Sequence, residues 1–232
     1  LLTKHAEDSI AAFKKAIDRT PEAFAGDRNW KNYVRYNLAA AYLDAGSPKS
    51  TLDELKAIEP DSLDVPNRIK YFQLRARAHE QSGNLTAAAR EWAELAKQAP
   101  SRGIDLSKVP MLESNFDSLL ARIQDRGQLE ELVEATDKSP LAPHALFRLI
   151  RRELDENKTA KASDHIREFL RLHASSPKAA EVGQWLRGLR EGDSAAELSI
   201  GLLVPQTGKY ARFGQRIIQG VSLALGIFDG SE

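Results

Sequence analysis

The chain of 232 residues contains no cysteine. Without thiols, the sequence excludes a disulfide framework and a thiolate metal site, and it fits cytoplasm and periplasm equally well. The chain also lacks an excess of either charge, because 33 basic residues balance 33 acidic ones. No overall field therefore draws it to nucleic acid or to anionic lipid. No apolar run reaches the ~20 residues that a membrane-spanning helix needs.

The sequence also lacks the short motifs of common catalytic and metal sites. Its five histidines form neither a His-Glu-x-x-His pair nor a spacing typical of zinc sites. No Gly-x-Ser-x-Gly turn and no phosphate-binding loop occurs, and acidic pairs such as Glu130-Glu131 lie in charge-mixed stretches typical of solvated helices. We therefore expect a protein that is not an enzyme, with no catalytic residue, no metal and no cofactor.

Residues 72–100 carry the clearest periodic pattern in the chain. Gly83 interrupts a helical pattern, since glycine adopts left-handed dihedrals without a steric penalty. Asn84 is suited to cap a second helix, and Pro100 is expected to stop it. One face of that helix collects apolar residues, namely Leu85, Ala88, Trp92, Leu95 and Ala96. The pattern predicts two antiparallel helices joined by a tight turn.

This stretch resembles a tetratricopeptide repeat, a helix–turn–helix unit of ~34 residues. The residues that carry the resemblance are Ala76, Gly83, Ala88, Trp92, Leu95 and Pro100. Phe72 and His79 stand where the family usually has tryptophan and tyrosine. Similar helix pairs recur up to residue 190, and no stretch before that point alternates as a strand would. We expect residues 1–190 to be an all-α, tetratricopeptide-like α-solenoid of helix hairpins.

Several helix ends can be assigned within this solenoid. Ser47, followed by Pro48, predicts one helix start. Ser114 and Thr159 predict two further caps, and Gly127 predicts a turn between two helices.

The helical periodicity of the sequence ends after residue 190. We expect a linker over residues 191–197 and a second, unfinished domain over residues 198–232. Residues 198–204 form a continuous apolar run typical of a buried parallel strand, and a glycine-bearing turn and an apolar helix follow. Strand, turn and helix in this order are the first half of a βαβ unit.

This tail resembles the opening of a type I periplasmic binding protein. The matching residues are Pro205, Thr207, Gly208, Gly214, Gly220 and Ala224. The resemblance implies a truncated α/β domain in which Thr207 and Gly208 lie near a ligand. The alternative is that the glycines only shape the turn. We also expect the tail's apolar side chains to be covered by the repeats or by another chain; these are Leu202, Val204, Ile217 and Val221.

Helical repeats joined to such an opening resemble the LpoA/LppC group of outer-membrane lipoproteins, which activate class A penicillin-binding proteins. The resemblance implies a non-enzymatic periplasmic regulator of peptidoglycan synthesis. Its partner would be a penicillin-binding protein and possibly also peptidoglycan. It would meet the membrane only through a lipid anchor absent from this chain. Two alternatives remain open: a repeat-bearing solute receptor of the branched-chain-amino-acid-binding type, and a generic protein–protein adapter.

Two groups of side chains are candidates for docking a partner. Arg148, Arg151 and Arg152 crowd one predicted helix and could bind an acidic partner or glycan. The alternative is a solvated face, neutralised by acidic residues such as Glu153 and Asp155. The second group is Tyr33 and Tyr36, which could face the groove that solenoids use for peptides. The alternative is that these rings belong to the core.

Overall fold

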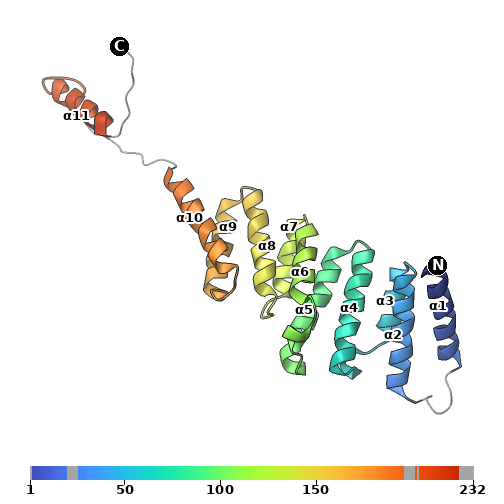
Figure 1. The fold of residues 1–232 in the computed structure, drawn as a ribbon. Helices are drawn as coiled ribbons and strands as arrows, with labels where there is room; N and C mark the ends of the chain where they lie inside the picture. The colour runs from blue at the N-terminus through green and yellow to red at the C-terminus, as the bar shows by residue number, and fades with distance from the viewer. Residues whose placement is uncertain (1, 20–25, 196–201, 203, 225–232) are drawn as a thin grey trace. The chain divides into compact units, whose positions relative to one another are not determined.

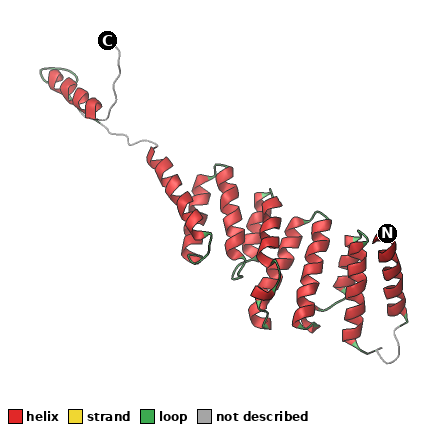
Figure 2. Ribbon diagram, viewed as in Figure 1, coloured by secondary structure: helices red, strands yellow, loops and turns green. Residues whose placement is uncertain are grey.

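The computed structural model describes residues 2–19, 26–195, 202 and 204–224. Among these residues all regular secondary structure is helical (Figure 2). This confirms the all-α prediction for the repeats. The chain divides into two compact units, residues 1–187 and residues 188–232.

The first unit is a row of α-helices (Figure 1). Its helices are α1 (Leu2–Asp18), α2 (Arg28–Asp44), α3 (Pro48–Lys56), α4 (Val65–Gln81), α5 (Leu85–Arg102), α6 (Leu112–Arg122), α7 (Arg126–Ala135), α8 (Ala142–Asp155), α9 (Thr159–Leu172) and the first part of α10 (Ala179–Ala195). Within the described residues, the 3₁₀ turns η2 (Pro60–Ser62) and η3 (Leu106–Lys108) lie between these helices.

The helices of this unit stack as an α-solenoid does. Helices α2 and α3, α4 and α5, and α8 and α9 pack together as hairpins. The first helix of a hairpin also packs on the last helix of the hairpin before it, as α4 does on α3 and α8 on α7. The pair α6 and α7 departs from this rule, because each packs on α5 and α8 rather than mainly on the other. Each hairpin buries its apolar face only through its neighbours.

The hairpin of α4 and α5 has the predicted local structure. Gly83 is left-handed, with φ of 75°, and the side chain of Asn84 accepts a hydrogen bond from the Ala87 N–H at 3.1 Å. Ala88 and Trp92 are buried on α5. The small side chain of Ala88 therefore lets the two helices approach, and the ring fills the space one turn later.

The prediction that Pro100 ends α5 is wrong. The helix continues to Arg102, and Gly103 follows it in the left-handed conformation with φ of 65°. A proline removes the single hydrogen bond that its own N–H would donate to the preceding turn. In the last turn this loss is tolerated, and the helix ends where Gly103 reverses the backbone dihedral.

Gly103→Ala should lower the free energy of unfolding by about 1 kcal/mol, because a side chain is disfavoured at positive φ. No atom lies within 4 Å of the Cβ that alanine would add. The cost therefore comes from the backbone alone. Gly183→Ala is the matched control, since Gly183 lies inside α10 with equally open surroundings. It should stabilise the protein by up to about 1 kcal/mol. Urea unfolding of both variants measures this, and effects of equal sign would contradict the backbone explanation.

Three other predicted helix ends need correction. Helix α6 begins after Met111, not at Ser114, whose hydroxyl instead donates to the Met111 carbonyl. Gly127 lies inside α7, which Asp125 caps by accepting from the Gln128 N–H. Lys158, not Thr159, precedes α9. Met111 and Lys158 make no side-chain capping hydrogen bond, so α6 and α9 begin without the polar cap on which these predictions rest.

The second unit contains helix α11 (Ala211–Ala224) after a turn. Gly208 is left-handed, with φ of 77°. A Cβ on Gly214 would collide with the backbone carbonyl of Pro205, so this position requires glycine. Gly208 thus lies in the predicted turn, and Gly214 lies within α11, where it allows close approach to Pro205.

The predicted strand over residues 198–204 is not supported. Most of these residues lie outside the described part of the chain, and Leu202 and Val204 have neither helical nor strand conformation. A strand exists through hydrogen bonds to a neighbouring strand, and the described residues offer none. Helix α10 also continues to Ala195, through residues expected to be linker.

Apolar side chains remain exposed in this unit. Leu202 is 42 % exposed, Phe213 61 % and Ile217 46 %. The expectation that another surface covers them stays a prediction. Within the described residues, no helix combines the length and the apolar character needed to cross a membrane.

Candidate functional site: a tyrosine–asparagine pocket

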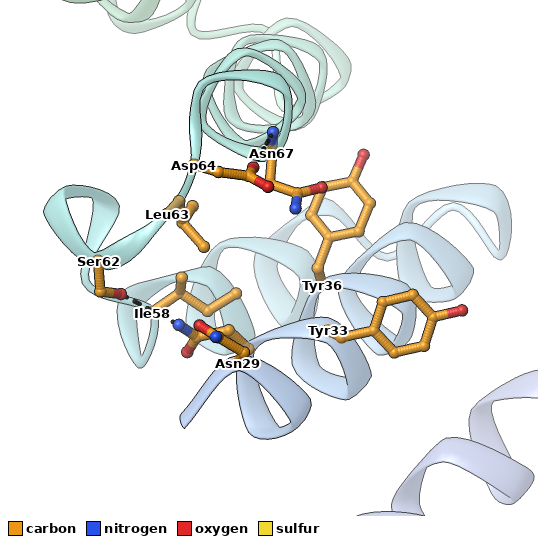
Figure 3. Close-up of a pocket in the computed structure, with 9 residues that line it drawn as sticks. Asn29, Tyr33, Tyr36, Ile58, Ser62, Leu63, Asp64 and Asn67 are labelled. Atoms are coloured by element: carbon orange, nitrogen blue, oxygen red, sulfur yellow. Dashed lines mark hydrogen bonds between the residues drawn. The ribbon is translucent and has the colours of Figure 1, made fainter. Parts of the chain in front are cut away.

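A pocket of about 320 Å³ lies between α2, the connection from α3 to α4, and the start of α4 (Figure 3). We call it the tyrosine–asparagine pocket. Its lining residues are Asn29, Asn32, Tyr33, Tyr36, Ile58, Ser62, Leu63, Asp64 and Asn67. Both tyrosines predicted to face a groove thus line the same cavity.

A buried arginine fixes the connection that forms one wall of the pocket. Arg68 is only 4 % exposed. Its Nε donates to the Pro60 carbonyl at 2.9 Å, and its Nη2 donates to the carbonyls of Asp61 at 3.1 Å and Leu63 at 3.0 Å. The guanidinium therefore satisfies three carbonyls of the η2 turn, a segment with few backbone hydrogen bonds of its own.

A second tie holds the η2 turn to α2. The Asn32 side chain donates from Nδ2 to the Ser62 hydroxyl at 3.1 Å, and this hydroxyl donates to the Glu59 carbonyl at 2.7 Å. Asn32 is buried, so its amide is a structural group. Hydrogen bonds thus connect the η2 turn to α2 through Asn32 and to α4 through Arg68.

Two aspartates set where the helices that flank the pocket begin. Asp27 caps α2 by accepting from the backbone N–H groups of Asn29 at 2.9 Å and Trp30 at 3.2 Å. Asp64 caps α4 by accepting from the Asn67 N–H at 3.0 Å. The caps place Asn29 and Asn67 in the first turns of the two helices, where both side chains are exposed at the pocket.

The two tyrosines differ in their surroundings. Tyr33 is 66 % exposed, whereas Tyr36 is half-buried. Burial raises the pKa of Tyr36 above its ordinary value, and this effect outweighs the positive charge of Arg77, which lowers it. Tyr36 therefore keeps its hydroxyl proton at neutral pH and can donate a hydrogen bond.

The side-chain amides of Asn29 and Asn67 make no hydrogen bond with any described residue. Each amide offers both donors and an acceptor. This is the combination that pairs with the N–H and C=O groups of a peptide backbone. The pocket therefore presents free amide donors and acceptors beside two aromatic rings.

The arginines predicted to dock a partner do not form a free cationic cluster. Arg148 donates from Nε to the Leu120 carbonyl at 3.0 Å and from Nη2 to the Ala121 carbonyl at 2.9 Å, at the end of α6. Arg152 pairs with Glu156 at 2.8 Å. Arg151 is exposed. Glu153, expected on the solvated face, is fully buried.

Thr207 and Gly208 lie in the turn before α11, and both are exposed. The structure shows Gly208 in the left-handed conformation in this turn. Their predicted role beside a ligand stays a prediction.

A second polar cavity, of about 400 Å³, lies where α6 and α8 meet the loop after α9. Asp117 accepts from His144 Nδ1 at 2.8 Å and pairs with Lys178 at 3.2 Å. Burial raises the pKa of Asp117, but the hydrogen bonds and charges of His144 and Lys178 outweigh it and leave the pKa below its ordinary value. Asp117, His144 and Lys178 thus pair with one another in this cavity. Within the described part of the chain, no group of three side chains that could hold a metal ion occurs.

The sequence did not point to Arg68, Asp64, Asn29 or Asn67. One signal was available for Asp64, Asn29 and Asn67. An aspartate, Asp27 or Asp64, precedes each of the two apolar helical stripes, and an asparagine follows that aspartate within three residues. Arg68 carried no such signal, because its three partners are backbone carbonyls placed by tertiary structure.

Comparison of the chain with families of known proteins, with characterised proteins and with solved structures gave no match.

Proposed function

We propose that the first unit is a protein-interaction scaffold that binds an extended segment of a partner polypeptide in the tyrosine–asparagine pocket. The observation that carries this proposal is the pair of unused amides, Asn29 and Asn67, which line the same pocket as Tyr33 and Tyr36. Exposed aromatic rings are frequent energetic centres of protein interfaces. The hairpins around the pocket are proposed to be tetratricopeptide-like.

The specific partner that we propose is a class A penicillin-binding protein, and the proposed setting is the periplasm, with the protein acting as a non-enzymatic activator of peptidoglycan synthesis. This part rests on the sequence resemblance of the repeats and the tail. Purified full chain and the periplasmic portion of such a synthase would be tested for binding by interferometry and for altered glycan polymerisation.

Replacing both tyrosines with alanine, Tyr33→Ala with Tyr36→Ala, should weaken binding of the partner segment by about 30-fold, because two aromatic contacts of about 1 kcal/mol each are lost. Tyr210→Ala is the matched control, since Tyr210 is 55 % exposed but lies outside the pocket. An array of extended peptides supplies the readout without presupposing the partner.

The outcomes separate the two levels of this proposal. Peptides that bind through the tyrosines, with no binding of the synthase, would retain the scaffold and reject this partner. No tyrosine-dependent binding to peptides or synthase would reject the scaffold itself.

A further inference from the structure

The tyrosine–asparagine pocket carries one formal charge, and it is negative. Of its nine lining residues only Asp64 is ionised at neutral pH, and none is lysine, arginine or histidine. The lining by itself favours a positive group over a carboxylate, while the positive charge of Arg77 acts on Tyr36 from outside the lining.

The carboxylate of Asp64 is only partly used by the fold. It accepts the Asn67 N–H at 3.0 Å as the cap of α4, and it has no ion-pair partner among the described residues. Arg68 stands one turn later, but its guanidinium is directed into the η2 turn, where it donates to three carbonyls. Asp64 is exposed, and Figure 3 shows its side chain directed toward Asn67, beside the ring of Tyr36. A carboxylate oxygen is thus available to a ligand.

The tyrosines supply the second element of a cation site. The face of an aromatic ring attracts ammonium and guanidinium groups, and the attraction strengthens where water is partly excluded. Tyr36 is half-buried and keeps its neutral ring at physiological pH. Ile58 and Leu63 add an apolar wall, which suits the methylene stem of a long basic side chain.

We infer that the tyrosine–asparagine pocket binds a lysine or arginine side chain of the partner segment, with Asp64 as the counter-charge and the rings of Tyr33 and Tyr36 against the cation. This inference rests on the proposed function, because it names the side chain that the bound segment presents. The unpaired amides of Asn29 and Asn67 would hold the backbone on either side of that side chain.

The test uses blocked tripeptides with the full chain. Acetyl-Gly-Lys-Gly-amide is compared with acetyl-Gly-norleucine-Gly-amide, which keeps the apolar stem without the charge, and with the glutamate tripeptide. Fluorine NMR of fluorotyrosine-labelled protein reports on the five tyrosines, assigned by single Tyr→Phe variants. We expect saturable shifts of Tyr33 and Tyr36 with the lysine tripeptide, and at least about tenfold weaker binding of the other two.

Asp64→Asn separates charge from structure. Asparagine caps helices as well as aspartate does, so α4 should keep its start, while the lysine tripeptide should bind about tenfold more weakly. Asp44→Asn is the matched control, because Asp44 is exposed at the other end of α2 and the variant changes the net charge equally.

Equal shifts with the norleucine tripeptide, unchanged affinity in the Asp64→Asn variant, or no shift of Tyr33 and Tyr36 would each overturn the inference. The failure of the broader proposal looks different. If peptides bind through the tyrosines whatever their lysine content, the scaffold stands and the cation site falls. If the lysine tripeptide binds but peptides longer than it do not, the cation site is supported and the scaffold is rejected.

Discussion

Arg68→Ala should lower the free energy of unfolding by about 3 kcal/mol and disorder the wall of the tyrosine–asparagine pocket. The variant removes three hydrogen bonds from a charged donor to the carbonyls of Pro60, Asp61 and Leu63, and bonds of this kind contribute about 1.5–3 kcal/mol each, without being additive. Of the three carbonyls, that of Pro60 also accepts the Leu63 N–H at 3.2 Å, whereas those of Asp61 and Leu63 depend on the guanidinium for their hydrogen bond. Urea unfolding measures the loss, and amide hydrogen exchange over residues 58–64 reports on the wall.

Two further variants isolate the hydrogen bonds of Arg68. Arg68→Met keeps an apolar stem of similar length without donors, and it should be nearly as unstable as the alanine variant. Arg77→Ala, at an exposed position on the same helix, should change stability by less than about 0.5 kcal/mol. Stability close to that of the parent protein in Arg68→Met would show that packing, and not the clamp on the turn, holds this wall.

His165→Ala should destabilise the protein by about 3 kcal/mol at neutral pH, because it leaves a buried carboxylate without its partner. Glu153 has no exposed surface, and His165 Nδ1 lies 2.8 Å from its Oε2. The other oxygen, Oε1, is buried and has no hydrogen-bond partner in the described structure. Thermal and urea unfolding would measure the change.

The companion variant is the double substitution His165→Ala with Glu153→Met. It replaces the orphaned charge by an apolar side chain and should recover most of the lost stability, since the penalty lies in the charge and not in the vacated volume. Arg167→Ala removes an exposed pair with Asp164 on the same helix and should cost about 0.5 kcal/mol or less. A double variant as unstable as His165→Ala would contradict this account.

Local signals predicted much of the solenoid. Gly83 and Asn84 act within a single turn, so their conformations follow from the residues themselves. Pro100 and Gly127 misled because their effect depends on position within a helix: each is tolerated in a terminal turn, where few intrahelical bonds are at stake.

The predicted strand failed for a different reason. A continuous apolar run predicts that a segment is buried, but a strand also needs a neighbouring strand to which its backbone hydrogen-bonds. The described residues of the second unit supply no such neighbour for Leu202 and Val204.

The candidate site was half predictable. Tyr33 and Tyr36 are aromatic residues one turn apart on a helix, and the sequence placed them together. Asp64 and Arg68 belong to the site through contacts between α2 and the connection to α4, which join segments about 30 residues apart, as in the Asn32–Ser62 hydrogen bond. Such pairings depend on how hairpins stack, and single-residue patterns do not encode them.

The stacking contacts also bear on whether the hairpins can be exchanged. Arg90 of α5 pairs with Glu131 of α7, while Arg122 of α6 pairs with Glu80 of α4. Each of the two helix pairs, α4–α5 and α6–α7, thus contributes one arginine and one carboxylate to the interface between them. In the same interface, the Thr86 hydroxyl donates to the side-chain oxygen of Gln128. These exposed pairs contribute little stability individually, but they distinguish the correct neighbour from any other. The helix pairs of the array are therefore not interchangeable. Deleting or transposing the α6–α7 segment would leave Glu80 and Arg90 without their ion-pair partners.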